Sequence, residues 1–212
     1  MKEQPVVITS PGAAEDLERA ELERAELYGL LARCWQAPPD EALFSQFAVA
    51  VTEAPQPGSF LEAPWQALVA AMRASSVAAA GAEYDALFQG IGKAEIFLYG
   101  SHHMAGALNE KPLVALRHDL DALGLTRDIT SNETEDHIAY LFELMRYLIA
   151  GDDPLVCNLE RQRRIFRAHV QPWVGALCDA VEQHPRARLY GALAGFTRAF
   201  VQVETQAFDM IE

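Results

Sequence analysis

The side chains best suited to chemistry gather in one short segment of this sequence. Residues 130–137 read TSNETEDH, and they place Glu133, Glu135, Asp136 and His137 between a polar and an apolar stretch. Carboxylates beside an imidazole can form a catalytic pair, a metal site, an acidic docking surface, or the capped start of a helix. The composition and helical pattern of the rest of the chain bear on which of these applies.

The structural interpretation of the segment is a helix that begins inside it. Thr130, Ser131 or Asn132 can cap a helix, and Thr130 with Glu133 has the spacing of a capping box. Carboxylates in the first helical turn would each gain about 0.3–1 kcal/mol from the helix dipole. His137 fits this interpretation less well, because positive charge is disfavoured at the amino-terminal end of a helix.

The residues give little support to catalysis or metal binding. Asp136 and His137 are adjacent, about 100° apart around a helix, so they do not naturally form an Asp–His pair. The histidine spacings of zinc sites are absent, and GIGK at 90–93 only partly resembles a phosphate-binding loop. We therefore expect no catalytic residue, no metal and no cofactor. A nucleotide-binding or nucleotide-hydrolysing enzyme using Asp136, His137 and this loop is the alternative function, and a purely structural helical scaffold is a third.

The composition favours a cationic partner. The 212 residues carry a formal net charge of −13, which argues against binding the phosphates of nucleic acid. The same charge attracts basic partners. The three cysteines, Cys34, Cys157 and Cys178, lack C-x-x-C spacing and fit reduced thiols. No stretch approaches the roughly 20 apolar residues of a membrane span, so we expect a cytoplasmic protein.

Hydrophobic spacing is helical almost throughout, and no stretch alternates in the manner of a strand. Pro112 and Gly124 fit the start and the stop of one helix, and Tyr84 with Phe88 lies on an apolar stripe typical of a core. The predicted fold class is all-α. The helices are expected at about residues 15–36, 40–51, 63–79, 82–91 and 112–123, from Ser101, from the TSNETEDH segment to Gly151, and at 155–183 and 187–210.

The predicted organisation is one helical domain. We expect residues 1–14 to be a flexible N-terminus and residues 15–212 to form a single compact bundle, or two helical subdomains with a candidate hinge near 124–154. The sequence GDDP at 151–154 ends one helix and could begin the next, since aspartate caps helices and proline fits their first turn.

Several segments resemble the TorD/DmsD family of redox-enzyme maturation chaperones. ETEDHIAYLFELM at 133–145 resembles the family signature, a Glu-Pro-x-Asp-His motif followed by an apolar helix, with Thr134 in place of the proline. Leu98–Ser101 partly matches an aromatic-x-Ser segment of the family. The stretches RIFRAHVQPWVGALCDAV and LYGALAGFTRAFVQVE are similar to its C-terminal helices, and the order holds from about residue 25 to the end.

The resemblance implies an all-helical chaperone that catalyses no reaction. Such proteins bind the twin-arginine leader and the apo-form of a molybdopterin-containing oxidoreductase until its cofactor is inserted and export can proceed. Exchanged helices occur in the family, so either a monomer or a domain-swapped dimer is expected. The matched positions and the acidic rim give six expected leader-binding residues: Tyr99, Ser101, Glu133, Glu135, Asp136 and His137.

The chemistry of such a leader suits this charge pattern. Two adjacent arginines and an apolar stretch would fit an apolar groove with an acidic rim. We therefore expect Asp136→Asn and His137→Ala to weaken the peptide complex and to leave the thermal transition of the protein nearly unchanged.

Overall fold

The protein is helical throughout the part that the structure describes. The computed structural model describes residues 11–49, 59–90, 94–126 and 133–210. Within these ranges no strand forms beyond one isolated bridge, so the all-α prediction is confirmed. None of the helices in these ranges is both long enough and apolar enough to cross a bilayer.

The helical elements follow one another with short connections. Two of them, η1 and η2, are single π-helical turns that continue a preceding α-helix. In chain order the elements are α1 (Pro11–Gln36), α2 (Glu41–Val49), α3 (Glu62–Ala74), α4 (Val77–Tyr84), η1 (Asp85–Gln89), α5 (Gly100–Ala105), α6 (Lys111–Ala122), α7 (Ile138–Ala150), α8 (Leu159–Ile165), η2 (Phe166–Val170), α9 (Gln171–Glu182) and α10 (Leu189–Asp209).

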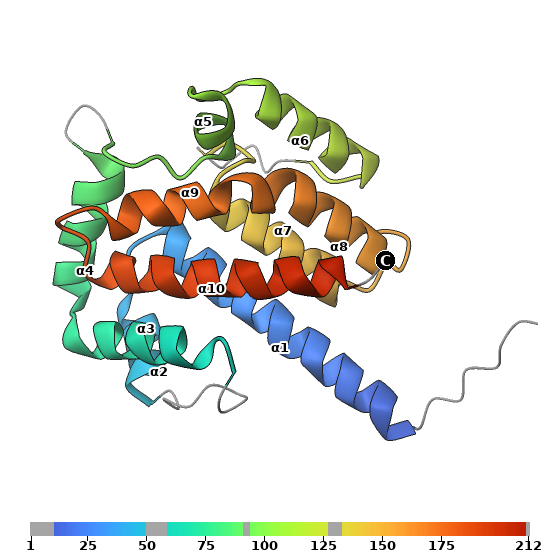
Figure 1. Ribbon diagram of the computed structural model, residues 1–212, viewed down its shortest axis with the longest axis horizontal. Coiled ribbons are helices and arrows are strands. Elements are labelled where there is room, and N and C mark those ends of the chain that lie inside the picture. The colour runs from blue at the N-terminus through green and yellow to red at the C-terminus, as the bar shows by residue number, and fades with distance from the viewer. Residues whose placement is uncertain (1–10, 50–58, 91–93, 127–132, 211–212) are drawn as a thin grey trace, which may run out of the picture.

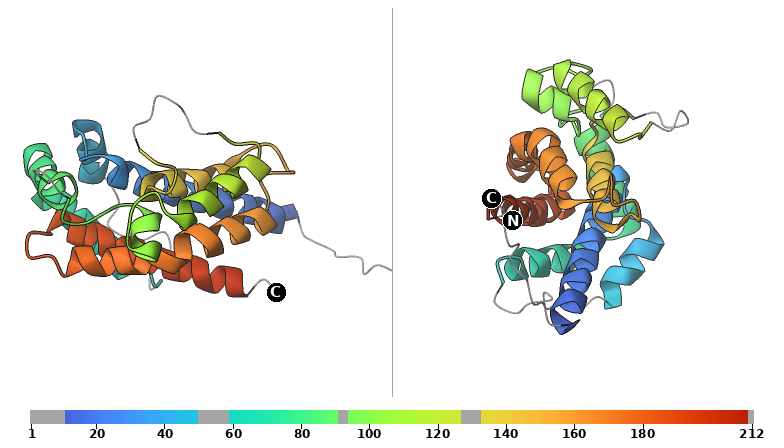
Figure 2. Two further views of the ribbon diagram at one scale, coloured as in Figure 1. Left: turned by 90° about the horizontal axis from the view of Figure 1, so that it is seen from above. Right: turned by 90° about the vertical axis from the view of Figure 1, so that its right-hand side faces the viewer.

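Three helix pairings organise the bundle (Figure 1). α1 packs along α7, and α10 packs against both α9 and α3. α5 and α6 form a further layer over α9, at the top of Figure 1 and of the right-hand view in Figure 2. Large buried aromatic side chains fill the core between these layers: Tyr28, Trp35, Phe142, Trp173, Tyr190, Phe196 and Phe200.

A buried ion pair fastens α1 to α10. The carboxylate of Glu204 accepts hydrogen bonds from Arg24 Nε (2.8 and 2.9 Å) and from the hydroxyl of Tyr28 (2.7 Å). Arg24 also donates to Gln162 of α8 (3.0 Å), so three helices meet at this network. Burying a carboxylate is unfavourable unless it is paired and hydrogen-bonded, and both conditions are met here.

Local signals placed several helix ends correctly. Asp40 Oδ1 accepts the backbone N–H of Leu43 (2.8 Å) at the start of α2. Pro112 lies in the first turn of α6, and Gly124 follows that helix with a φ of 70°. A positive φ is readily adopted by glycine, which explains why the helix stops there.

Side-chain caps explain two predicted boundaries that are wrong. The break between α3 and α4 lies before residue 80, because Ser76 Oγ accepts the N–H of Ala79 (3.2 Å) and caps α4. α8 begins later than predicted, because Asn158 Oδ1 accepts the N–H of Arg161 (3.0 Å) and caps it. The GDDP segment follows the end of α7, as expected, but it does not begin α8. It forms a turn in which Asp153 accepts hydrogen bonds from backbone N–H groups, among them that of Leu155.

The predicted domain limits stay predictions. α1 begins at Pro11, inside the stretch 1–14 that the sequence suggests to be flexible, and residues 1–10 lie outside the described ranges. The candidate hinge at 124–154 contains α7, which packs along α1.

Candidate binding site

The acidic segment before α7 is a turn and not the first turn of the helix, because α7 begins at Ile138. The prediction that the carboxylates at 133–136 form the first turn of this helix is therefore wrong, and the candidate caps at 130–132 lie outside the described ranges. Two backbone hydrogen bonds explain the start. Ile138 N–H donates to the carbonyl of Leu98 (2.9 Å), and Gly100 N–H donates to the carbonyl of Asp136 (2.9 Å).

His137 is the N-cap of α7. Its Nδ1 accepts the N–H of Ala139 (3.2 Å), and its side chain is only 3% exposed. Burial lowers the pKa of His137 from 6.5 to about 4, although the nearby carboxylates of Glu133 and Asp136 oppose this. The ring is therefore neutral near pH 7, and because Nδ1 is an acceptor, its proton is on Nε2. A neutral ring explains how a histidine can begin this helix.

Asp136 joins the acidic turn to α5. Its Oδ2 accepts the backbone N–H of Ser101 (2.7 Å) at the start of α5, and its Oδ1 accepts the hydroxyl of Thr134 (2.6 Å). The side chain is 3% exposed, so both oxygens are used inside the protein. Thr134, which replaces the proline of the family signature, thus has a role that a proline could not have.

A cavity of about 200 Å³ opens beside this turn and brings three of the expected residues together. Tyr99, Glu133 and His137 line it, and the Tyr99 hydroxyl donates to the Glu133 carboxylate. The rings of Tyr99 and His137 meet edge to face, 5.2 Å apart. Apart from Gln89, mainly apolar and aromatic side chains form the remaining wall, among them Tyr84, Phe88, Ile96, Leu98 and Leu108. Tyr84 and Phe88 were predicted only as core, and their sequence spacing gave no sign of the cavity.

The other expected residues lie elsewhere. Ser101 is buried, and its hydroxyl has no hydrogen-bond partner in the described part of the chain. Glu135 pairs with Arg117 of α6 (2.9 Å) and so ties the turn to the α5–α6 layer. The acidic segment therefore has two roles in the structure. Glu133 lines the cavity, whereas Glu135 and Asp136 bind neighbouring elements and hold the turn in place.

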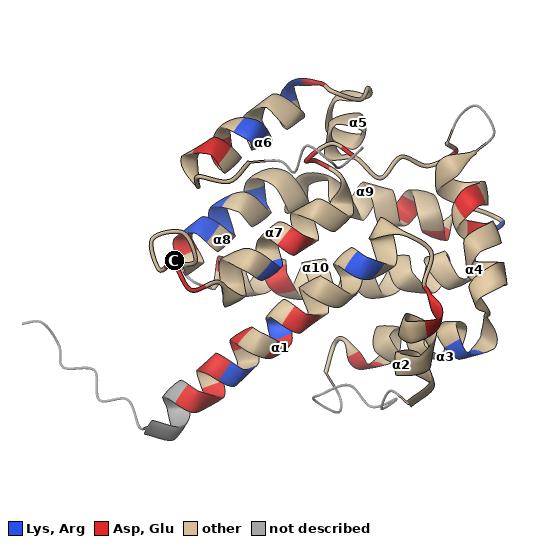
Figure 3. Cartoon of the chain, turned by 180° about the vertical axis from the view of Figure 1, so that it is seen from behind, with Lys and Arg blue, Asp and Glu red and all other residues tan. Residues whose placement is uncertain are grey.

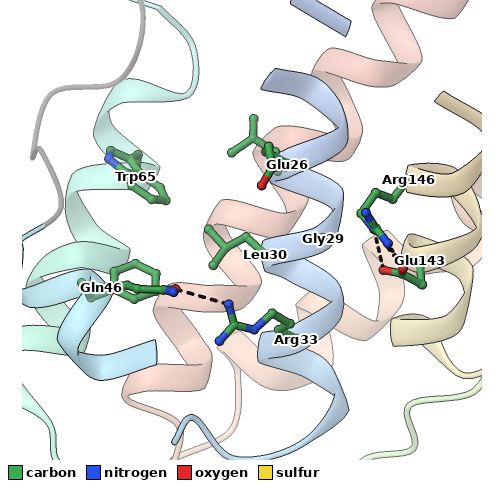
Figure 4. Close-up of a pocket in the computed structure, with 10 residues that line it drawn as sticks. Glu26, Gly29, Leu30, Arg33, Gln46, Trp65, Glu143 and Arg146 are labelled. Atoms are coloured by element: carbon green, nitrogen blue, oxygen red, sulfur yellow. Dashed lines mark hydrogen bonds and ion pairs between the residues drawn. The ribbon is translucent and has the colours of Figure 1, made fainter. Parts of the chain in front are cut away.

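A larger cleft lies along α1, and sequence reasoning missed it. Its volume is about 730 Å³, and it continues into a second hollow of about 440 Å³ that shares Arg33 and Glu143 with it. We call the larger one the α1 cleft (Figure 4). Its walls come from α1, α2, α3 and α7, and it is lined by Glu26, Leu27, Gly29, Leu30, Arg33, Gln46, Phe47, Trp65, Glu143 and Arg146.

The nucleotide-enzyme alternative finds no support in this geometry. The carboxylate of Asp136 is occupied by Ser101 and Thr134, and residues 91–93 of the GIGK stretch lie outside the described ranges. Within the described ranges, no three His, Cys, Asp or Glu side chains converge as metal ligands would.

The lowered pKa of His137 predicts a pH dependence of stability. Between about pH 6.5 and pH 4, His137 is protonated in the unfolded chain but neutral in the native protein. The free energy of unfolding therefore falls as the pH falls. The loss from this one group should reach about 2 kcal/mol at pH 5. In His137→Asn, which retains a capping side chain, the free energy of unfolding should therefore drop by about 2 kcal/mol less than in the wild type between pH 7.5 and pH 5.

Urea unfolding at the two pH values measures this difference. Burial also lowers the pKa of His103, but that contribution is common to both proteins and cancels in the comparison. Parallel stability curves for wild type and variant would show that His137 titrates normally.

Comparison with known proteins places the chain in a family. Residues 56–179 match the family model described as "Nitrate reductase delta subunit". Over 110 residues the chain is 29% identical to the Chaperone protein TorD of Vibrio cholerae serotype O1, strain O395, and equally to that of strain M66-2. Each alignment covers 49% of this chain and 50% of the relative. The chain thus spans about half the length of the curated relatives it matches. Because the family model covers more than half of the chain, the protein belongs to the family that this model describes, which is the TorD family.

Proposed function

We propose that this protein is a cytoplasmic maturation chaperone, which binds the twin-arginine leader and the apo-form of a molybdopterin-containing oxidoreductase and catalyses no reaction of its own. The observation that carries the proposal is the family membership, since the relatives are named chaperones. On this proposal the protein aids cofactor insertion and delays export until insertion is complete.

The cavity beside α7 supplies the chemistry for leader binding. A leader arginine would meet the Glu133 carboxylate and the aromatic wall, two features that attract a guanidinium group. The cavity of about 200 Å³ is smaller than the roughly 300 Å³ at which sites for whole small molecules begin. It is therefore suited to one leader side chain, and the apolar stretch of the leader would lie outside it.

The six expected residues then divide by role. Tyr99, Glu133 and His137 would contact the leader. Asp136, Ser101 and Glu135 would hold the contacting residues in position, because their side chains are buried or paired with other elements.

Leader titration tests the proposal. We expect a leader peptide from a molybdoenzyme encoded beside this protein to bind in the micromolar range by calorimetry, and Glu133→Gln to weaken binding about tenfold or more. Glu110→Gln is the matched control, because Glu110 is an exposed carboxylate at the start of α6. Rising salt should weaken the wild-type complex and affect Glu133→Gln less.

Two outcomes would contradict the proposal. If neither the leader nor the apo-enzyme binds at tens of micromolar, the chaperone assignment is refuted. Leader binding that is equally strong in Glu133→Gln and in the control would keep the chaperone but move the leader away from this cavity.

A further inference from the structure

The amino-terminal half of α1 is exposed and strongly acidic. Residues 15–20 are all exposed, and Leu22 is 59% exposed on the same stretch. Figures 1 and 2 show this part of α1, in blue, projecting beyond the other helices. Residues 15–23, which we call the α1 arm, carry five carboxylates and one arginine. Figure 3 shows that acidic side chains, in red, predominate along this stretch.

Ion pairs within the chain leave most of this negative charge in place. Arg19, the arginine of the arm, pairs with exposed Asp16 (2.8 Å), and Arg24, just beyond the arm, pairs with buried Glu204. Three exposed carboxylates of the arm form no ion pair with a residue in the described ranges: Glu15, Glu18 and Glu23. The arm therefore attracts a cationic partner.

The same face of α1 continues into the α1 cleft. Helical spacing places Glu23 in line with Leu27 and Leu30, and both leucines are half-buried in the cleft. Phe47 and Trp65 form the facing wall (Figure 4). The cleft thus has an apolar floor of the kind into which an amphipathic helix docks.

The far end of the cleft carries the opposite charge. Arg33 is exposed there and donates to Gln46 (3.3 Å), whereas Glu143 and Arg146 on the α7 wall pair with each other (2.9 Å). From residue 15 to residue 33 this face changes from acidic through apolar to basic over about 27 Å, the length of a helix of about five turns. It is complementary to a helix with cationic residues at one end and an apolar face beyond them.

The charge also distinguishes between occupants. The α1 helix of a second copy is disfavoured, because its own exposed half is acidic. The leader has its proposed place in the cavity beside α7, and no described residue lines both that cavity and the α1 cleft. The occupant left is the body of the client, the part of the apo-enzyme that follows the leader.

We propose that the α1 arm and the α1 cleft together bind a helix of the apo-enzyme body, one with several arginines or lysines at one end and an apolar face beyond them. This inference rests on the proposed function for the identity of the client. One client molecule can occupy both sites, with its leader in the cavity beside α7 and this helix in the α1 cleft.

Binding of the apo-enzyme without its leader tests the proposal. We expect the leaderless apo-form of the molybdoenzyme encoded beside this protein to bind in the micromolar range by calorimetry. Glu23→Arg/Glu26→Arg should weaken this binding about tenfold or more, because both reversals repel the cationic end of the helix. The same variant should bind the leader peptide within about threefold of wild type, because neither residue lines the cavity beside α7. Amide hydrogen exchange of residues 15–30 should slow when the leaderless apo-enzyme binds.

A matched control separates local charge from net charge. Glu110→Arg/Asp121→Arg changes the net charge equally at exposed positions on the two ends of α6, and it should bind the leaderless apo-enzyme within about threefold of wild type. Glu23→Gln/Glu26→Gln removes the two charges without reversing them, so its loss of affinity should be intermediate. Glu23 and Glu26 are exposed, and thermal unfolding checks that each variant is folded.

Three results would overturn the proposal. The first is a leaderless apo-enzyme that does not bind although the leader peptide does, which would leave the proposed function standing. The second is equal binding of the leaderless apo-enzyme to the double reversal and to the control, or no slowing of exchange in residues 15–30. The third is loss of leader affinity in the double reversal, which would give the α1 cleft to the leader. If neither leader nor apo-enzyme binds, the proposed function fails and this inference fails with it.

Discussion

Replacing Glu204 by alanine should lower the free energy of unfolding by about 3–5 kcal/mol, as expected when one partner of a buried ion pair is removed. Glu204 is 2% exposed, and the variant removes the buried partner of the mostly buried Arg24 guanidinium, which keeps only the more exposed Glu21 as an ion-pair partner. It also orphans the hydroxyl of Tyr28, which is fully buried. Burial and the neighbouring Glu204 raise the pKa of Tyr28, so this hydroxyl stays protonated and needs an acceptor. Urea unfolding at neutral pH measures the loss.

The charge and the hydrogen bonds at Glu204 can be separated. Glu204→Gln keeps an acceptor for Tyr28 but removes the negative charge beside Arg24, so its stability should lie between those of wild type and Glu204→Ala. The double variant Arg24→Met/Glu204→Leu removes both charges and should recover much of the loss. A loss below about 1 kcal/mol in Glu204→Ala would mean that water replaces the carboxylate.

Helix positions were predictable where the signal is local. The apolar spacing of Leu31, Cys34 and Trp35 marks the buried face of α1, and all three are fully buried. Pro112 and Gly124 act through their own backbone conformations, so they mark the ends of α6 whatever surrounds them. The all-α fold follows from patterns of this kind.

The start of α7 was not predictable, because a distant partner determines it. The local pattern of carboxylates in TSNETEDH predicts a first helical turn. In the structure, however, the Asp136 carboxylate accepts the backbone N–H of Ser101, 35 residues away. Pairing of this turn with residues 98–100 keeps the chain out of helical conformation up to His137, so the helix begins at Ile138. Similarly, Asp153 and Asn158 are both good caps, and only the packed structure decides which of them begins α8.

The candidate site was predictable in part. Family resemblance singled out Tyr99 and His137, and the acidic rim singled out Glu133; these three line the cavity. Their neighbours Tyr84 and Phe88 have the spacing of ordinary core residues, and nothing local distinguishes a core wall from a cavity wall. The α1 cleft depends on where four helices lie relative to one another, so no single stretch of sequence predicts it.

The burial of Asp136 changes what its substitution should do. Asp136→Ala leaves the N–H of Ser101 without its acceptor and removes the partner of Thr134, so we expect a loss of about 2–4 kcal/mol in the free energy of unfolding. Asp136→Asn should cost only about 1 kcal/mol, because its amide can accept from Ser101 and donate to the Thr134 oxygen. Urea unfolding of the two variants gives both values.

Leader affinity then decides whether Asp136 contacts the leader or positions the residues that do. Because both oxygens of Asp136 are occupied inside the protein, Asp136→Asn should keep leader affinity within about threefold of wild type, whereas Glu133→Gln should lose about tenfold or more. This differs from the expectation drawn from the sequence, in which Asp136→Asn weakens binding and leaves the thermal transition unchanged. If calorimetry shows binding lost in Asp136→Asn while its unfolding curve overlays that of wild type, the carboxylate must reach the leader, and the turn before α7 must open for it to do so.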